Sequence, residues 1–245
     1  MNIRRNLMMM PLLALVLAAA GCMIGNGPPV GETHTISKSV PLGQAKSVGV
    51  DIKMGAGELK VSGGATDLMN ADFTYNVDAW KPDVRYDAGG DQGHLTIEQP
   101  ETHGHRGHTR NEWNIRLNDQ VQAELNANLG AGRANLDLVG LKLSRFEFNL
   151  GAGETDVNLD GHWSQDLAGS VQGGVGKATL HLPREVGVRV TAQGGLGAIK
   201  ANGFTKNGDV YTNDAYGKSP VKLDISVQGG VGEIDLVLGG GGGTV

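Results

Sequence analysis

The sequence has very little cysteine, few aromatic residues and no long apolar run outside its first twenty or so residues. Among 245 residues there is one cysteine, and Phe, Tyr and Trp together make up 4%. With one cysteine the chain forms no internal disulfide, so its fold depends on packing alone. Because aromatic side chains usually supply much of the buried area of a core, their scarcity argues against a bulky globular interior.

Basic residues are also in the minority. The sequence holds 21 Lys and Arg against 26 Asp and Glu, for a formal net charge of −5. A mildly acidic chain is a poor match for nucleic acid or for anionic lipid headgroups, since both are bound by basic surfaces. We therefore expect no nucleic-acid partner.

The one extended apolar run lies at the start of the chain. Arg4 and Arg5 precede the run at residues 7–20, which leads into Gly21 and Cys22. The run is shorter than the roughly 20 residues of a membrane-spanning helix, so residues 1–21 are predicted to be a secretory signal peptide. Its end resembles the lipobox of bacterial lipoproteins, which implies cleavage before Cys22 and lipid attachment to Cys22. The alternative is an ordinary signal cleavage site.

Lipidation of Cys22 predicts an extracytoplasmic, membrane-anchored lipoprotein. Several acyl chains on one cysteine, palmitate among them, anchor a protein durably, whereas a single chain binds only marginally. Met23 after the cysteine implies, by the sorting pattern of such lipoproteins, the outer membrane of a bacterium with two membranes. Residues 22–32, which are rich in Gly and Pro, are predicted to be a flexible tether.

Glycine is what the chain has in abundance, at 40 residues. Residues 125–138, LNANLGAGRANLDL, consist of two alternating apolar runs joined by Gly130, Ala131 and Gly132. Alternation at every second residue is typical of a half-buried strand, so this G-x-G is predicted to be a corner between two strands. Other copies of the motif have their second glycine at Gly57, Gly153, Gly176, Gly197 and Gly232.

The spacing of these copies predicts a stacked repeat. From Gly132 onward, the next three second glycines follow after 21, 23 and 21 residues. A fixed period near twenty with strand-type content indicates a solenoid. We predict an all-β fold: a single β-solenoid, parallel β-helix-like, of about 21-residue rungs with GxG corners, in which each rung repeats the path of the one before.

Stacking in register predicts columns of like side chains. Four residues before each second glycine the chain carries a polar side chain, which either hydrogen-bonds up the stack as an amide ladder or remains solvated. The column consists of Lys53, Asn128, Asn149, Gln172, Gln193 and Gln228.

The solenoid is predicted to cover residues 33–238. Its first part, residues 33–110, is less regular, and the regular repeats occupy residues 120–238 with an insertion at residues 203–220 that carries the hairpin signal Asn-Gly. Residues 239–245 form a glycine tail that we expect to be disordered. Because open ends of a stack invite pairing, a homo-oligomer remains an alternative to a monomer.

A histidine-rich loop is the candidate metal site. His103, His105 and His108 lie in a glycine-rich stretch, and imidazoles at such spacing can converge on zinc, copper or nickel. Arg106 and Arg110 in the same loop would repel a divalent cation. A solvated loop without metal is the alternative, and we expect no cofactor.

Signals for catalysis are weak. Lys177 follows a glycine-rich stretch, but Ala178 and an alternating strand come next, where a phosphate-binding loop requires Ser or Thr and a helix. Asp137, Asp156 and Asp235 lie at comparable positions of different copies, which is compatible with a polysaccharide-acting β-helix enzyme and equally with a solubilising face. No nucleophile-elbow sequence is present. We predict a non-enzymatic protein and keep that enzyme as the alternative.

Two tyrosines in the insertion, Tyr211 and Tyr216, are candidates for a contact surface. Aromatic rings in turns bind glycans or protein partners, and they also plug the flanks of thin cores. Both interpretations remain open for this pair.

The order of the motifs resembles that of the toast-rack domains. The motifs that carry the resemblance are LGAG at residues 129–132 and again at 150–153, then GVGKATLHLP, VGVRV, GGLG, the pair Tyr211 and Asn213, and GVGEIDLVL. These domains are related to the C-terminal domain of LiaF-type envelope-stress proteins and to a class of adhesin domains. The resemblance covers residues 33–238 and implies a β-solenoid-like fold outside the cytoplasm, with no established catalytic residues to carry over.

From the resemblance and the lipobox we predict a lipid-anchored cell-envelope protein that uses its solenoid surface for contact. The predicted partner is an envelope protein, or a glycan of the cell wall, and the predicted role is in envelope-stress sensing or adhesion. LiaF-type proteins carry membrane helices before the domain, and this chain carries a lipobox instead.

Overall fold

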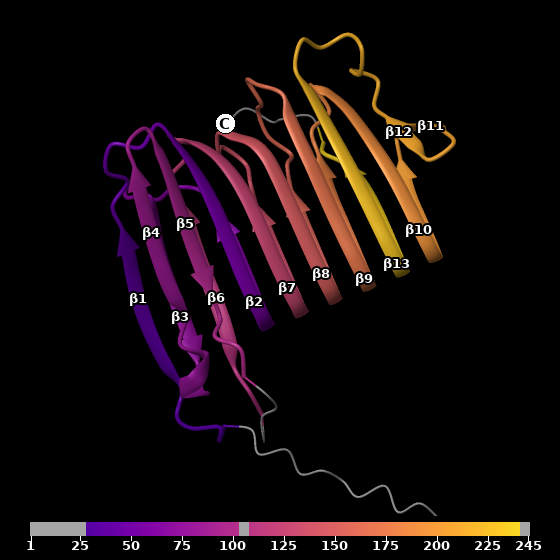
Figure 1. The fold of residues 1–245 in the computed structure, drawn as a ribbon. Helices are drawn as coiled ribbons and strands as arrows, with labels where there is room; N and C mark the ends of the chain where they lie inside the picture. The colour runs from indigo at the N-terminus through magenta and orange to yellow at the C-terminus, as the bar shows by residue number, and fades with distance from the viewer. Residues whose placement is uncertain (1–27, 103–107, 241–245) are drawn as a thin grey trace, which may run out of the picture.

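The computed structural model describes residues 28–102 and 108–240. Its 13 strands form one open sheet, and the long strands bend into a stack of U-shaped rungs (Figure 1). The single helical element of these residues is a short 3-10 helix at Asp78–Trp80. Within the same residues, no helix has the length and apolar character to cross a membrane. The predicted all-β, solenoid-like fold is confirmed.

Six long strands make up the rungs. Each consists of a first arm, a G-x-G corner and a second arm that runs back, and each pairs in parallel with the next rung. The rungs are β2 (Ser47–Ser62), β7 (Gln122–Asp137), β8 (Leu143–Asn158), β9 (Leu167–Leu182), β10 (Gly187–Asn202) and β13 (Lys222–Leu238).

Shorter strands cover the ends of the stack. At the N-terminal end, β5 pairs with the first arm of β2, and β6 pairs with its second arm. At the other end, the hairpin of β11 and β12 pairs with the first arm of β10. The short strands are β1 (His34–Val40), β3 (Met69–Tyr75), β4 (Asp83–Gly89), β5 (Gln92–Glu98), β6 (Asn111–Leu117), β11 (Thr205–Asn207) and β12 (Val210–Thr212).

The rungs do not stack fully in chain order. The sheet order is β2-β7-β8-β9-β13-β10, so β13 lies between β9 and β10. The prediction that each rung stacks on the one before is therefore wrong at this one place. After β10 the chain forms the β11–β12 hairpin on the outer side of β10 and then returns to the inner side, where β13 pairs with β9 and β10 over nearly its whole length.

The second glycine of each corner has no room for a side chain. At these six positions φ lies between +134° and +151°, a region that is essentially restricted to glycine. A Cβ at Gly153 would lie 1.8 Å from the backbone oxygen of Gly132 in the neighbouring rung, and one at Gly197 would lie 1.6 Å from that of Gly232. The glycines thus permit the corners to approach at the spacing of hydrogen-bonded strands.

The core is a thin aliphatic layer between the two arms. Leu125, Leu136 and Phe146 are each no more than 1% exposed, as their alternating positions predict. Phe146 stacks on Phe148 with ring centroids 4.9 Å apart, and Gly169 of the next rung leaves space for it, since a Cβ there would lie 2.1 Å from Phe146 Cζ. In this column a large residue in one rung is thus accommodated by glycine in the next rung.

The predicted amide column is in register, with Lys53 at its N-terminal end. Asn149 Nδ2 donates to Asn128 Oδ1 at 2.9 Å, which forms one step of a ladder. Gln193 at the far end donates instead to Asp209 Oδ2, 3.2 Å away. The column thus lies on the surface of the first arms, and one hydrogen bond between neighbouring amide side chains is found among the described residues.

Candidate contact surface

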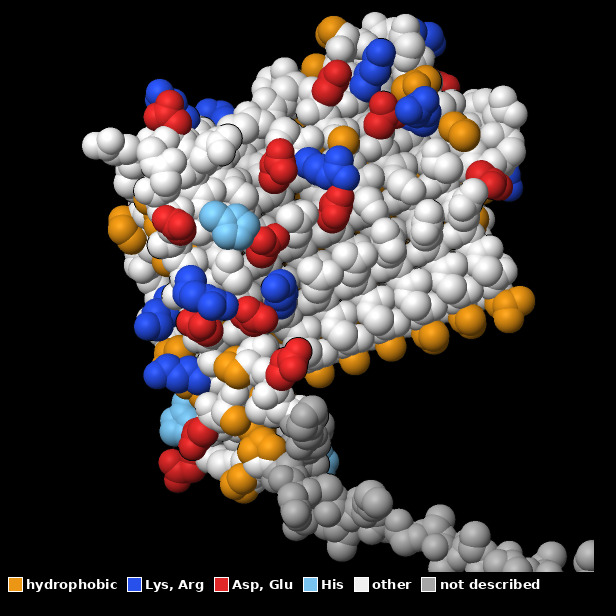
Figure 2. All heavy atoms as spheres, in the orientation of Figure 1, with side chains coloured by type: hydrophobic (Ala, Val, Ile, Leu, Met, Phe, Trp, Pro, Cys, Tyr) orange, Lys and Arg blue, Asp and Glu red, His pale blue; other side chains and the backbone are white. Residues whose placement is uncertain are grey.

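An apolar ridge runs along the corners. The residue between the two corner glycines points outward, and register brings the six copies into one column. In stack order the ridge consists of Ala56, Ala131, Ala152, Val175, Val231 and Leu196. Figure 2 shows this ridge as an orange row along the edge of the stack where the corners lie.

The ridge side chains become larger towards β10, where alanine gives way to valine and leucine. Val175, Val231 and Leu196 are 58%, 47% and 74% exposed, although each is a large aliphatic side chain. Apolar side chains held in a row along the corners of a rigid stack are typical of a surface that binds a partner. The ridge is thus the first element of the candidate contact surface.

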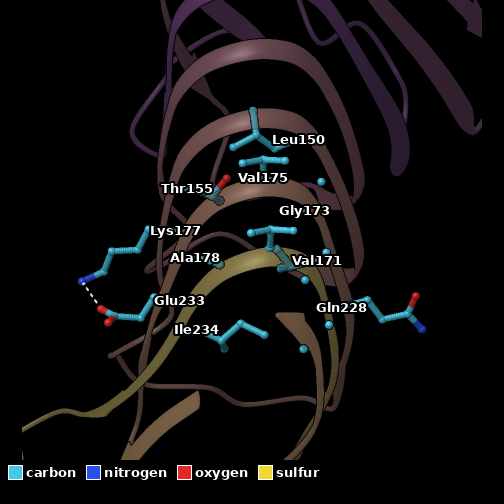
Figure 3. Close-up of a pocket in the computed structure, with 18 of the residues that line it drawn as sticks. Leu150, Thr155, Val171, Gly173, Val175, Lys177, Ala178, Gln228, Glu233 and Ile234 are labelled. Atoms are coloured by element: carbon cyan, nitrogen blue, oxygen red, sulfur yellow. Dashed lines mark ion pairs between the residues drawn. The ribbon is translucent and has the colours of Figure 1, made fainter. Parts of the chain in front are cut away.

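Beneath the larger half of the ridge lies a small apolar cavity. Met54, Leu129 and Leu150 fill the inside of the bend in β2, β7 and β8, whereas the same column holds glycine in the next three rungs, beginning with Gly173. Figure 3 shows Leu150 inside the arch and Gly173 at the corresponding place in β9. The cavity measures about 30 Å³, room for no more than a few water-sized groups.

The doubled glycine of these later corners is a signal that sequence reasoning missed. The sequence reads Leu-Gly before the ridge residue in β7 and β8, and Gly-Gly in β9, β10 and β13. The first of the two residues points into the bend, so the change from leucine to glycine predicts a hollow there.

Charges of alternating sign line the second arm. In stack order, the residue after the second glycine is Glu58, Arg133, Glu154, Lys177 and Glu233, followed by Ala198 in β10. Arg133 Nε lies 3.1 Å from Glu154 Oε2, and Lys177 Nζ lies 3.0 Å from Glu233 Oε1. Opposite charges on neighbouring strands stabilise the in-register stack. Lys177 is therefore a paired outer charge rather than part of a phosphate loop.

The charges are densest next to β10. Lys177 Nζ also lies 2.6 Å from Asp235 Oδ2, and Lys200 Nζ lies 2.5 Å from Glu233 Oε2. Hydrogen bonds from Lys200 and then from Lys177 lower the pKa of Glu233 to about 2. The same carboxylates, Asp235 first, raise the pKa of Lys177. At the β10 end of the stack, the second arms thus carry two lysines and two carboxylates whose charges cancel.

We expect Glu233→Gln to lower the thermal midpoint at pH 7 and to have little effect at pH 2. The pKa of Glu233 is lower in the folded chain than its ordinary value of 4.5, so the ion pairs stabilise the fold above about pH 4.5. That stabilisation is lost as the pH falls through about 2. Thermal unfolding followed by circular dichroism between pH 2 and pH 7 measures the difference.

The matched control is Glu185→Gln, at an exposed residue outside this group. Its midpoint should follow that of the unsubstituted chain at every pH. A difference for Glu233→Gln that is as large at pH 2 as at pH 7 would show that the ion pairs are not its source.

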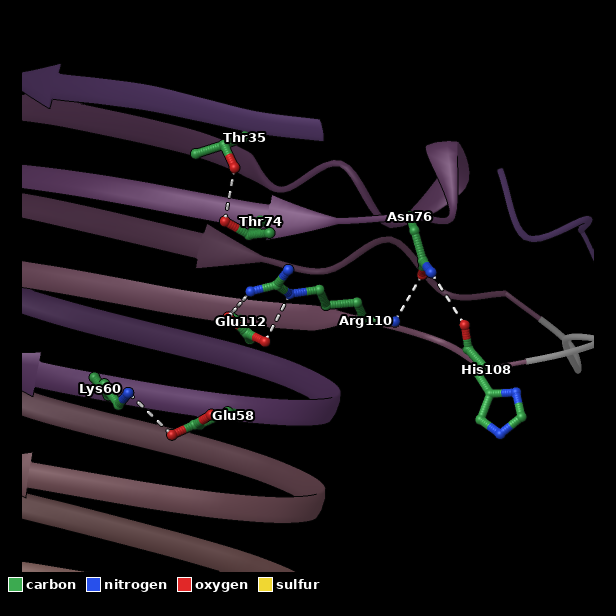
Figure 4. A network of polar contacts seen from close by, with 8 residues as sticks. All are labelled: Thr35, Glu58, Lys60, Thr74, Asn76, His108, Arg110 and Glu112. Carbon is green, nitrogen blue, oxygen red and sulfur yellow. Dashed lines mark hydrogen bonds and ion pairs between the residues drawn. The ribbon is translucent and has the colours of Figure 1, made fainter. Parts of the chain in front are cut away.

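The candidate metal ligands are only partly covered by the structure. Cys22, His103 and His105 lie outside the described residues. His108 is exposed, and its backbone oxygen accepts a hydrogen bond from Asn76 Nδ2 at 3.0 Å (Figure 4). Among residues 28–102 and 108–240, no three His, Cys, Asp or Glu side chains are grouped to hold a metal ion. Metal binding by the loop stays a prediction.

The three carboxylates of the enzyme alternative lie on different strands and have separate partners. Asp137 accepts a hydrogen bond from Asn158 Nδ2 at 3.1 Å, and Asp156 lies 3.2 Å from His181 Nε2. Asp235 is paired with Lys177. Asp137 and Asp156 belong to a solvated outer face, whereas the side chain of Asp235 is only 16% exposed. The three do not form a pair of carboxylates that converge in a cleft.

The two tyrosines of the insertion have different surroundings. Tyr211 is 4% exposed and packs in the core, with Lys206 Nζ 5.2 Å from its ring centroid. Tyr216 is half-buried beside the Arg189 guanidinium, 5.9 Å from its ring centroid. Tyr211 therefore plugs the flank of the core, and Tyr216 is the ring that remains partly available for contact.

The buried carboxamide of Asn213 fastens the insertion to β10. Its Nδ2 donates to Val186 O at 2.8 Å, and its Oδ1 accepts from Val188 N at 3.0 Å. A buried amide that satisfies backbone groups in this way fixes one arrangement of the segment. The role of Asn213 is thus structural.

A family model and one solved structure agree on the fold. The family model for the N-terminal domain of toast_rack, DUF2154, matches residues 29–181. A crystal structure of a putative cell adhesion protein from Clostridium sporogenes ATCC 15579 is 32% identical, with a TM-score of 0.82 over 85% of this chain and 100% of that chain. A putative adhesin from Bacteroides fragilis NCTC 9343 is 9% identical, with a TM-score of 0.33 over 86% and 100% of the two chains. No curated protein matches.

Proposed function

Because the chain belongs to the toast-rack family, we propose that it is a non-enzymatic, lipid-anchored protein of the cell envelope. In this proposal the solenoid lies outside the cytoplasm and is presented for contact with another protein or with the cell wall. The lipid on Cys22 holds it at the membrane, which is the outer membrane in a bacterium with two membranes.

The observation that carries the proposal is the apolar ridge on a rigid stack. Six rungs hold its residues in register, and its three large aliphatic side chains are 47%, 58% and 74% exposed. Such a surface supports binding, whereas Asp137, Asp156 and Asp235 lie on different strands and each has its own partner. Likeness to the putative cell adhesion protein of Clostridium sporogenes supports adhesion as the contact that the solenoid makes.

We expect Cys22→Ser to abolish lipidation and surface retention. The thioether-linked lipid requires the cysteine sulfur, and the rest of the chain is too acidic to hold to anionic headgroups. Cells grown with an alkyne analogue of palmitate should label the natural chain and leave the variant unlabelled. The variant should appear in the medium or the periplasm, and cell adhesion to an envelope-coated surface should fall to the level of a deletion strain.

Ser62→Cys in a Cys22→Ser chain is the control for labelling at any cysteine, and it should stay unlabelled. Equal labelling of the natural chain and Cys22→Ser would contradict the lipid anchor. Unchanged adhesion by the deletion strain would contradict the contact function itself.

A further inference from the structure

The two ends of the stack differ in how they are covered. At the N-terminal end, β5 and β6 pair with both arms of β2. Its corner is covered as well, because Gly55 N donates to Gln99 Oε1 at 3.0 Å and Asn111 Nδ2 donates to Ala56 O at 2.8 Å. The outer edge of β2 is thus closed along both arms and at the corner.

The outer edge of β10 is open over its second arm. β12 pairs only with Arg189, Val190 and Thr191 of the first arm. Within the described part of the chain, no strand pairs with the outer edge of residues 198–202, which leave their outward N–H and C=O groups unpaired. An unpaired strand edge is a template for a further strand.

We propose that this edge of β10 binds one extended segment of a partner protein, which adds a strand to the stack. The inference rests on the proposed contact function, because it names the place where a protein partner binds and the chemistry that it offers. The ridge residue Leu196 and the cavity under Gly194 lie at the corner end of the same edge.

The shape of this end favours a single segment over a second copy of the chain. The β11–β12 hairpin extends the first-arm layer by two strands beyond β10, about 10 Å at the usual strand spacing (Figure 1). Suppose that a second copy of the chain paired the second arm of its β10 with the second arm of this β10 across a two-fold axis. The β11–β12 hairpins of the two copies would then occupy the same space. A lone strand lies beside the hairpin without this conflict.

Charge and side-chain pattern define the segment. Lys200 lies on the outer face, with its side chain 60% exposed and its Nζ paired with Glu233 of β13. Its register partner on β13 is Asp235. A carboxylate on the added strand opposite Lys200 would pair with its ammonium group from the side away from β13. Ile199 and Ala201 are half-buried and face the core, so they favour aliphatic residues on either side of that carboxylate.

A peptide with the sequence of residues 231–238, VGEIDLVL, is the probe. In the chain, this segment pairs with the edge of β9 that corresponds to the open edge of β10. A free copy of the segment can therefore use the same hydrogen-bonding edge against β10, which places the carboxylate of Asp235 opposite Lys200. We expect saturable binding of the fluorescein-labelled peptide to the mature protein by anisotropy. Lys200→Glu should weaken binding by about five- to tenfold, and Lys200→Gln by less.

The control variant is Lys60→Glu, because Lys60 holds the same column in β2, where β6 already covers the edge. It should bind the peptide like the unsubstituted protein. A second peptide with Glu233→Lys and Asp235→Lys should bind Lys200→Glu better than the first peptide does. This exchange of charge separates a direct contact from a general loss of stability.

Hydrogen exchange provides a readout that needs no variant. Binding of the first peptide should slow exchange of the outward amides of residues 198–202. Absence of saturable binding, protection at another surface, or a dimer that the peptide displaces would each overturn the proposal. If the peptide binds as expected but the deletion strain adheres as well as the parent strain, the proposed function fails and the docking site stands.

Discussion

Gly153→Ala is expected to destabilise the domain by roughly 3–5 kcal/mol, enough to leave much of the chain unfolded at growth temperature. The added Cβ would lie 1.8 Å from Gly132 O, and φ at this position is +134°. Relief of the contact requires the two rungs to separate, which breaks hydrogen bonds between them. Urea unfolding followed by circular dichroism measures the loss.

Two control variants separate the causes. Gly208→Ala, in the hairpin turn, has φ +60° and no atom within 4 Å of the new Cβ, so it should cost only about 1 kcal/mol for the backbone conformation. Gly151→Ala has no positive φ, but its Cβ would lie 2.3 Å from Gly130 O, so it should fall between the other two. Equal losses for Gly153→Ala and Gly208→Ala would show that close stacking of the corners is not what requires glycine.

This result bears on function, because the corners carry the ridge. Glycine at both sides of each ridge residue lets the rungs approach, and that approach holds Val175, Val231 and Leu196 side by side on the surface. The G-x-G motif, which could be mistaken for a nucleotide loop, therefore serves to present a row of side chains rather than to bind a phosphate.

Much of the fold could be predicted because its pattern is local. Alternation around Gly132 places Leu129 and Ala134 on one face of their strands, and both are buried. The repeat spacing predicts parallel neighbours, and the amide column is in register. Each of these features depends only on the residues of one rung and the next.

The order of the last rungs could not be predicted in this way. β9, β10 and β13 share the same Gly-Gly-x-Gly corner, so the pattern allows any of them to stack on any other. The choice depends on how the insertion crosses the end of the stack, where Asn213 fastens it to β10. That contact joins residues far apart in sequence, and no periodicity reveals it.

The candidate surface was also only partly predictable. Tyr211 and Tyr216 occur in the same polar insertion, yet one packs in the core and the other remains partly exposed, because only Tyr211 points inward from β12. The ridge follows from the G-x-G pattern, but its exposure depends on the absence of covering segments. The open edge of β10 depends in turn on the strand order.

Engineered cysteine pairs on the ridge test this strand order, and with it the open edge of β10, most directly. In a Cys22→Ser chain the protein has no other cysteine, so each pair reports one distance. Val175 and Val231 lie on neighbouring strands in register, about 4.8 Å apart, which is within reach of a disulfide. Val175 and Leu196 are two strands apart, about 9.6 Å, which is beyond that reach.

The measurement is the yield of intramolecular disulfide after mild oxidation, read by mass spectrometry of the linked peptides. The substituted side chains are exposed, so the core is unchanged. We predict a high yield for Val175→Cys with Val231→Cys and almost none for Val175→Cys with Leu196→Cys. The reverse result would mean that β10 stacks directly on β9, and it would contradict both the strand order and the open edge derived from it.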